Sequence, residues 1–273
     1  MSTLQEVAGG ALRVQNVERT FALKDDVVRA LDKVSLEVPV GSFISLIGPS
    51  GCGKSTLLRL LAGLESPDAG SLLIGERSPD EMRMAGRLGV AFQDPALLPW
   101  RSVWKNITLP LQVMGKSVKE YQSAIEELIS LVGLKGFEQA LPSQLSGGMR
   151  QRVAIARALV TEPEVLLLDE PFGALDEMTR EHMQSELLSI CRASGTTVVF
   201  VTHSIPEAVY LSNRVVVMSP RPGRVTEIVD VSIEGERNDA TRDNSAFFKG
   251  ITSVREALRG VEMSDHVRGI EDR

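Results

Sequence analysis

Residues 45–64, SLIGPSGCGKSTLLRLLAGL, constrain the fold of this 273-residue chain more than any other stretch. A glycine-rich turn lies here between an apolar run typical of a buried strand and a run whose leucines recur at helical spacing. The stretch fits the pattern G-x-x-x-x-G-K-S, whose fixed positions are Gly48, Gly53, Lys54 and Ser55. Between a strand and a helix, such a loop turns backbone N–H groups and the positive end of the helix dipole toward phosphate oxygens.

The phosphate loop, defined here as residues 48–56, predicts a nucleotide site, and its glycines are expected to turn the backbone through positive φ. Lys54 is expected to neutralise the β- and γ-phosphates, and the Ser55 hydroxyl to ligate Mg²⁺. Cys52 is interpreted as a small filler, since no histidine or other base accompanies it. The alternative, an accidental glycine-rich turn, is disfavoured by the strand and helix on either side. The predicted nucleotide contacts in the loop are Gly48, Pro49, Ser50, Gly51, Cys52, Gly53, Lys54, Ser55 and Thr56.

Short apolar runs alternate with helical patterns along the chain, which predicts an α/β fold around a buried parallel sheet. The first 40 residues and residues 70–92 show more polar alternation, so we expect them to add an antiparallel β flank. The strand-like runs are LRVQNV (12–17), SFISLIG (42–48), RLGVAFQ (87–93), EVLLLD (164–169), TTVVFVT (196–202), RVVVMS (214–219) and RVTEIVDV (224–231).

Residues 95–160 interrupt this alternation with two helical patterns and no strand between them. We expect them to form a helical insertion, so that residues 1–94 and 161–234 make up the nucleotide-binding core. Residues 235–273 are expected to form a short C-terminal tail, in which a polar loop precedes one amphipathic helix near 245–259.

Composition restricts the compartment and the partners. The net charge of −6, from 30 basic and 36 acidic residues, argues against a DNA-binding role without excluding one. Cys52 and Cys191 are too few for a disulfide framework, and no signal sequence precedes Leu12. No apolar run approaches the ~20 residues of a membrane-spanning helix. We therefore expect a chain of the reducing cytoplasm that meets a membrane only through a partner.

An acidic pair follows the apolar run of VLLLDEP (165–171). Taken alone, such a pair is more often a solvated strand end or a helix cap than a catalytic site. Beside a phosphate loop the catalytic interpretation is favoured, because nucleotide hydrolysis needs a carboxylate-bearing site at the same sheet edge. Asp169 is expected to hold a magnesium-bound water, and Glu170 to polarise the attacking water.

LSGGMRQR (145–152) resembles the signature motif of ATP-binding cassette (ABC) ATPases, and it lies between the phosphate loop and VLLLDE in the order that this family shows. The resemblance covers residues from about 12 to 230. It implies a P-loop NTPase (RecA-like) parallel-sheet core with an antiparallel β flank and a helical subdomain specific to ABC proteins. It also implies hydrolysis of ATP with Mg²⁺.

Four further residues acquire roles from the resemblance. Gln93 in AFQDP matches the Q-loop, which implies a catalytic role and contact with Mg²⁺, and Phe21 occupies the place of an aromatic that stacks on adenine. His203 in VTHS matches the switch histidine at the γ-phosphate, although a lone histidine after a strand is commonly a satisfied core residue. Asp176 in GALD matches the D-loop, which crosses the interface between two copies, and it can also cap the helix that follows.

Ser146, Gly147 and Gly148 precede an amphipathic helix and are expected to form a capped N-terminus with free N–H groups, an anion site. In isolation, LSGG is most often an ordinary helix start. The resemblance implies more: two copies dimerise head to tail, and each signature closes over the ATP held by the other copy. Loss of the γ-phosphate then opens the dimer.

The chain also resembles the separate ATP-binding subunit of a bacterial importer, of the nitrate, sulfonate and taurine subfamily, in LLPWRSVWKNITLPL, DEPFGALDEMTRE and MSPRPGRV. The implied partners are transmembrane permease subunits at the cytoplasmic face of the membrane and, indirectly, a periplasmic or lipid-anchored solute-binding protein. Trp100, Val103 and Trp104 are candidates for a groove that takes a permease helix, and core packing is an equal alternative.

A second hypothesis remains open, a soluble ABC ATPase that acts on nucleic acid or ribosomes. Such proteins typically carry tandem cassettes, a long coiled-coil insertion or a basic tail, and none of these is visible in the sequence. A simple GTPase switch is a weaker alternative, since the guanine-reading pattern N-K-x-D is missing.

Overall fold

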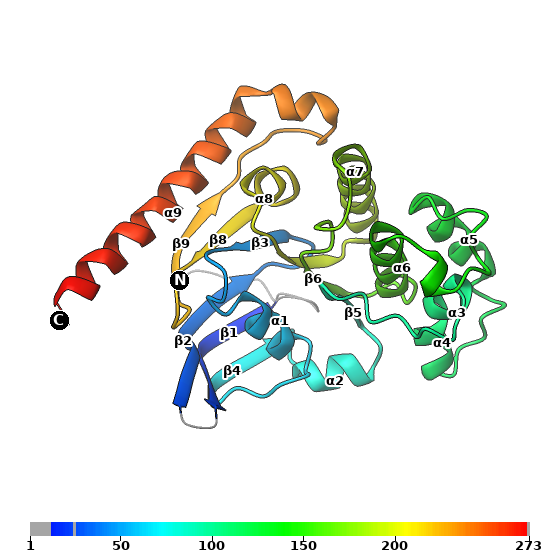
Figure 1. Ribbon diagram of the computed structural model, residues 1–273, viewed down its shortest axis with the longest axis horizontal. Coiled ribbons are helices and arrows are strands. Elements are labelled where there is room, and N and C mark those ends of the chain that lie inside the picture. Colours follow the sequence, from blue (N-terminus) through cyan, green and yellow to red (C-terminus); the bar gives the residue numbers. More distant parts are fainter. Residues whose placement is uncertain (1–11, 24–25, 272–273) are drawn as a thin grey trace, which may run out of the picture.

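Two β-sheets and the helices around them make up the structure, a computed structural model that describes residues 12–23 and 26–271 (Figure 1). The larger sheet has the strand order β5-β6-β7-β3-β8-β9, and the smaller, antiparallel sheet has the order β2-β1-β4. Residues 1–11, predicted to belong to the flank and core, lie outside the described residues. The strands are β1 (Leu12–Leu23), β2 (Asp26–Val38), β3 (Phe43–Ile47), β4 (Ala69–Ile74), β5 (Leu88–Ala91), β6 (Val165–Asp169), β7 (Thr197–Val201), β8 (Arg214–Met218) and β9 (Val225–Asp230).

The central strands of the larger sheet are apolar throughout because both of their faces are covered. Every residue of β3, β6 and β7 is buried. In β7, Val198 and Phe200 pack into the core on one face, whereas Val199 and Val201 pack into the core that contains the smaller sheet. This period of two is the alternation expected of a strand between two covered faces.

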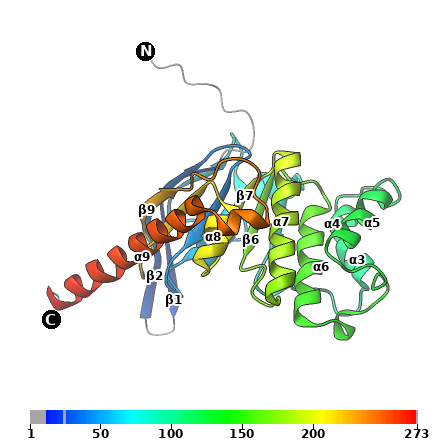
Figure 2. The ribbon, with the colours of Figure 1, turned by 90° about the horizontal axis from the view of Figure 1, so that it is seen from above.

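Helices lie on both faces of the larger sheet. Helices α7 and α8 lie on one face, and α1 lies between this sheet and the smaller one (Figure 1). Figures 1 and 2 place α3 to α6 at the end of the molecule opposite the C-terminal end of α9. The helices are α1 (Lys54–Leu61), α2 (Pro79–Met84), α3 (Val103–Ile107), α4 (Leu109–Val113), α5 (Gln122–Leu131), α6 (Gly147–Leu159), α7 (Glu177–Ser194), α8 (Ile205–Leu211) and α9 (Ser245–Glu271), with 3₁₀ turns η1 (Pro142–Gln144) and η2 (Asp239–Asp243).

The predicted fold class is therefore confirmed, with an α/β core, an antiparallel flank and a helical region. Three details of the prediction are wrong. Strand β9 is antiparallel to β8, because the connection over residues 219–224 is too short for the crossover that parallel strands require. Of residues 70–92, only β4 joins the flank, since β5 pairs in parallel with β6.

The third difference concerns α9, which continues to Glu271 and not to about residue 259. The sequence after 259 contains no proline, so nothing in the backbone obliges the helix to end where the amphipathic pattern fades. Over residues 12–23 and 26–271, no helix combines the length and the apolar character needed to cross a lipid bilayer.

Candidate nucleotide-binding site

The phosphate loop connects β3 to α1, and its glycines are needed for two different reasons. Gly51 and Gly53 have φ of 73° and 105°, in the left-handed region that favours glycine, and Gly53 caps the N-terminus of α1. Gly48 is not in that region, so the expectation of positive φ is wrong for it. A Cβ at Gly48 would lie only 2.7 Å from the carbonyl oxygen of Met218, so this glycine permits close approach of two backbones.

The side chain of Lys54 is folded into the loop and is 7% exposed. Its Nζ donates to the carbonyl oxygens of Gly48 (2.8 Å) and Pro49 (2.9 Å) and lies 3.6 Å from the Sγ of Cys52. Cys52 itself is buried. The loop thus holds a cation at its centre, where an anion can bind.

The other predicted site residues converge because four neighbouring parallel strands, β5, β6, β7 and β3, end at the same edge of the sheet. Gln93 follows β5, Asp169 ends β6, Glu170 comes next, and His203 follows β7. The phosphate loop follows β3. In open α/β sheets, the carboxyl ends of the strands are where ligands bind.

A cavity of about 620 Å³ opens at this edge. Among the residues predicted for the phosphate loop and the sheet edge, four do not line this cavity: Gly48, Pro49, Cys52 and Asp169. The other residues predicted there surround it, so the cavity joins the phosphate loop to the candidate catalytic side chains. The lining residues are Phe21, Val28, Ala30, Ser50, Gly51, Gly53, Lys54, Ser55, Thr56, Gln93, Glu170, His203 and Arg221.

Glu170 connects the two other candidate catalytic side chains. Its Oε2 accepts a hydrogen bond from Nε2 of Gln93 at 3.4 Å and lies 3.3 Å from Nδ1 of His203. The backbone of Glu170 has φ of 46°, a left-handed conformation that is uncommon for residues other than glycine. Such local strain is found disproportionately at functional sites, so the geometry of Glu170 supports a role in chemistry.

Ser55, in the loop, and Asp169, at the end of β6, offer oxygen ligands for a metal ion. Burial raises the pKa of Asp169, and a hydrogen bond with Ser55 and the charge of Lys54 act in the opposite direction. Over the described parts of the chain, no group of three or more His, Cys, Asp or Glu side chains is arranged to hold a metal. A hydroxyl and one carboxylate fit Mg²⁺, which typically combines one or two carboxylates with phosphate oxygens and water.

Phe21 lines the cavity from β1, where it pairs directly with Val28 of β2. The guanidinium carbon of Arg19 lies 4.8 Å from the centroid of its ring. The cavity therefore has an apolar, aromatic wall as well as a polar one, which is the combination that a nucleotide base and its phosphates need.

Sequence reasoning missed Arg221, which lines the cavity and donates from Nε and Nη2 to the carbonyl oxygen of Gly51, both at 3.3 Å. Its loop lies against the phosphate loop because Gly223 has no side chain: a Cβ there would overlap the carbonyl oxygen of Cys52. The glycine and prolines of SPRPGR (219–224) are typical of a turn, but a local pattern does not indicate which loop that turn contacts.

The signature residues and Asp176 begin helices outside the cavity. The Oγ of Ser146 accepts from the backbone N–H of Met149 at 3.2 Å, which caps α6 as predicted. Asp176 caps α7 by accepting from the N–H of Thr179 at 3.0 Å, and this hydrogen bond lowers the pKa of Asp176. Gly147 and Gly148 follow Ser146 at the N-terminus of α6. Within one copy of the chain, these residues do not meet the phosphate loop.

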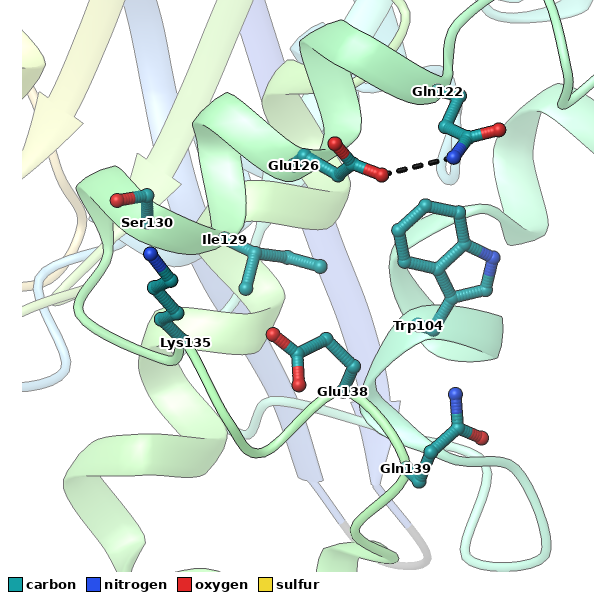
Figure 3. Close-up of a pocket in the computed structure, with 8 residues that line it drawn as sticks. All are labelled: Trp104, Gln122, Glu126, Ile129, Ser130, Lys135, Glu138 and Gln139. Carbon is teal, nitrogen blue, oxygen red and sulfur yellow. Dashed lines mark hydrogen bonds between the residues drawn. The ribbon is translucent and has the colours of Figure 1, made fainter.

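The predicted groove of Trp100, Val103 and Trp104 does not form as one surface. Val103 is 1% exposed and belongs to the core, whereas Trp100 is 71% exposed. Trp104 lines a second cavity, of about 640 Å³, in which its ring and the side chain of Ile129 face the same space (Figure 3). The remaining lining is polar and includes Gln122, Glu126, Ser130, Lys135, Glu138 and Gln139.

The family model described as ABC transporter matches residues 31–173. A Methanocaldococcus jannaschii protein, an uncharacterised ABC transporter ATP-binding protein, is 47% identical over 244 residues, which are 89% of this chain and 90% of that protein. The aliphatic sulfonates import ATP-binding protein of Bacillus subtilis is 43% identical over 255 residues, 93% of this chain and 98% of that protein.

Two solved structures of an ATP-binding cassette are also similar. The dimeric structure of a bacterial ABC transporter cassette has a TM-score of 0.74 and 33% identity, and a dimeric post-hydrolysis state bound to ADP and Pi has a TM-score of 0.75 and 32% identity. Each match covers 82% of this chain and all of the other chain. The phosphate loop, the residues at the sheet edge and these matches together show that this protein belongs to the ABC transporter family and is an ATP-hydrolysing cassette.

Proposed function

We propose that this ATPase powers the import of a small anionic solute, such as nitrate, a sulfonate or taurine, through a separate membrane permease. The observation that carries the proposal is the convergence of the phosphate loop with Gln93, Glu170 and His203 around one cavity. The substrate class is supported by the relatives named as aliphatic sulfonates import ATP-binding proteins, at 43 to 45% identity over most of the chain.

The loop binds the triphosphate, and Phe21 stacks on the adenine. Lys54 exchanges its bonds to the carbonyls of Gly48 and Pro49 for phosphate oxygens, which are better partners because they carry negative charge. Mg²⁺, held by Ser55 and Gln93 and through water by Asp169, would neutralise charge on the phosphates. Arg221, which donates to the carbonyl oxygen of Gly51, adds a second cation at the loop.

Glu170 orients the water that attacks the γ-phosphate, and its carboxylate accepts a proton from that water as the bond to phosphorus forms. In the structure Gln93 and His203 both contact Glu170. A γ-phosphate placed among these groups competes for the Gln93 amide and the His203 ring. The carboxylate is then free to take the attacking water.

ATP is clasped between two copies of the chain. The N-terminus of α6 presents N–H groups to the γ-phosphate held by the other copy. Ser146 caps this helix, and Gly147 and Gly148 form its first residues, which have no side chains to block an approaching phosphate. Asp176 lies at the start of α7 beside this interface and links the two sites. The dimeric form of both similar cassette structures supports this arrangement. Hydrolysis removes the shared phosphate, and the dimer opens.

The permease docks at the cavity of Trp104. The lining combines the apolar side chains of Trp104 and Ile129 with the carboxylates of Glu126 and Glu138, two negative charges against the single cation of Lys135 (Figure 3). This chemistry suits an amphipathic helix that carries basic side chains. The protein would then lie at the cytoplasmic face of the membrane, as a peripheral subunit, and reach the solute-binding protein only through the permease.

The Glu170→Gln variant tests the catalytic assignment. It keeps the shape of the side chain but cannot accept the proton, so we expect ATP binding close to wild type and a fall in kcat of about 10²- to 10⁴-fold. ATP binding is measured by titration calorimetry and turnover by phosphate release. Turnover at the wild-type rate would contradict the role of Glu170.

A second experiment tests docking. Trp104→Ala should leave the basal ATPase rate of the purified chain unchanged and abolish its stimulation by the permease in membrane vesicles. Trp100→Ala is the matched control, because that tryptophan is exposed and lies outside the cavity. Retention of nucleic acid through moderate salt, with no permease in the membrane fraction, would instead favour the ATPase that acts on nucleic acid or ribosomes.

A further inference from the structure

A chain of buried and part-buried hydrogen bonds leads from the loop of His203 to the C-terminal tail, residues 235–273. His203 lies between Thr202 and Ser204, at the junction of β7 and α8. The Oγ1 of Thr202 accepts from the N–H of Ser204 at 3.0 Å and donates to Oε2 of Glu207 at 2.6 Å. These two bonds fix the backbone on both sides of His203.

Glu207 is in turn fixed by α7. Its Oε1 accepts from Nε2 of Gln184 at 3.0 Å, and Nε of Arg180 lies 3.9 Å from the same oxygen. Thr202, Gln184 and Glu207 are all buried. Because a buried carboxylate needs donors on its oxygens, the orientation of the Gln184 amide matters to Glu207.

Arg242, in η2, determines that orientation. Its Nη2 donates to Oε1 of Gln184 at 2.8 Å, and a guanidinium offers only donors. The amide oxygen of Gln184 must therefore face Arg242, which leaves the NH₂ group to face Glu207. Arg242 is itself held by Tyr210, whose ring centroid lies 3.9 Å from the guanidinium carbon, and by Glu181, 3.4 Å from Nε.

We propose that Arg242 is a positioning residue for His203. It acts through Gln184, Glu207 and Thr202, and through it the C-terminal tail affects the rate of ATP hydrolysis. Without Arg242, the Gln184 amide can turn and present its oxygen to Glu207. Glu207 then loses a donor, and the bond that holds Thr202 and the His203 loop shifts with it. The inference rests on the proposed role of His203 at the γ-phosphate.

The test compares kcat and KM for ATP of the full-length chain with those of Arg242→Ala. We expect kcat to fall several-fold while KM for ATP and the ATP Kd stay within twofold, because the phosphate loop is untouched. Arg242→Lys should restore part of kcat, since an ammonium also offers only donors to Gln184. Arg255→Ala, which removes an exposed arginine from α9, is the control and should leave kcat unchanged.

Two further variants separate the possible outcomes. His203→Ala should abolish most turnover, and Arg242→Ala should then cause no additional loss of kcat. If Arg242→Ala lowers Tm but keeps the wild-type kcat at a temperature where it is fully folded, Arg242 only anchors the tail and the inference is overturned. If His203→Ala keeps wild-type turnover, the proposed role of His203 fails, and the inference fails with it.

Discussion

Lys54 shows at the scale of a single residue how the loop is prepared for phosphate. Its ammonium is buried and bonded to two neutral carbonyl groups of its own loop. A buried cation without a full counter-charge is costly, so an anion that enters the loop is stabilised by more than one contact. Removal of the Lys54 charge should therefore weaken the binding of ATP.

Lys54→Ala should weaken ATP binding by at least about one to two orders of magnitude, because a hydrogen bond to a charged group contributes about 1.5–3 kcal/mol. Titration calorimetry with ATP measures the loss. Lys119→Ala, on an exposed lysine far along the chain from the loop, is the control and should bind ATP normally. Unaltered affinity in Lys54→Ala would contradict the assignment of the loop.

For single residues, the sequence predicted those roles that depend on neighbours in the chain. Gly53, Lys54 and Ser55 are consecutive, so the motif predicted their common role in binding phosphate. Arg221 contacts Gly51 across a separation of 170 residues, and no local pattern records such a contact. Gly48 was identified correctly as a loop residue, but its reason is the approach of Met218, which again depends on distant packing.

Among the elements, α8 depends on a residue outside itself. Arg237 is buried, and its guanidinium donates to the carbonyl oxygens of Tyr210 (2.6 Å) and Ser212 (2.7 Å) at the C-terminal end of α8. Burial lowers the pKa of Arg237 to about 10, which still leaves the group charged at neutral pH. A cation at this end of a helix satisfies orphan carbonyls and opposes the negative end of the dipole.

Arg237→Ala should therefore reduce the free energy of unfolding by about 1–3 kcal/mol, since the buried carbonyls lose their donors. Urea denaturation monitored by circular dichroism gives this value. An unchanged midpoint, compared with an unaffected Arg255→Ala variant, would mean that water replaces the guanidinium without loss.

Strands that are buried throughout were the elements that the sequence pattern predicted best. β6 and β7 are continuously apolar, and their type and place in the sheet followed from that pattern. The direction of β9 was missed because alternation within a strand says nothing about its partner. The full extent of α9 was missed because it was judged by its amphipathic face, whereas a helix can continue wherever the backbone allows it.

For the whole molecule, the separation between the phosphate loop and the α6 N-terminus is the central feature. Two structures suited to bind anions exist in one chain, and only one of them lines the cavity. Both motifs can be recognised in the sequence, but the distance between them depends on the fold. The functional unit we propose needs a second copy to bring them together.

Ser146→Arg should hinder closure of the dimer while each monomer still binds ATP, because the bulky cation occupies the cap position without touching the phosphate loop. Sedimentation velocity with ATP, in the Glu170→Gln background that prevents turnover, should show monomers for Ser146→Arg. Ser117→Arg, an exposed serine outside the site, should still dimerise. Equal dimerisation of the two variants would exclude α6 from the interface.

The most direct measurement is a crystal structure of the Glu170→Gln variant with ATP and Mg²⁺. We expect two copies related head to tail, with each γ-phosphate within hydrogen-bonding distance of the phosphate loop of one copy and of Ser146, Gly147 or Gly148 of the other. A structure in which each triphosphate contacts a single copy, with the α6 N-terminus turned toward solvent, would contradict it.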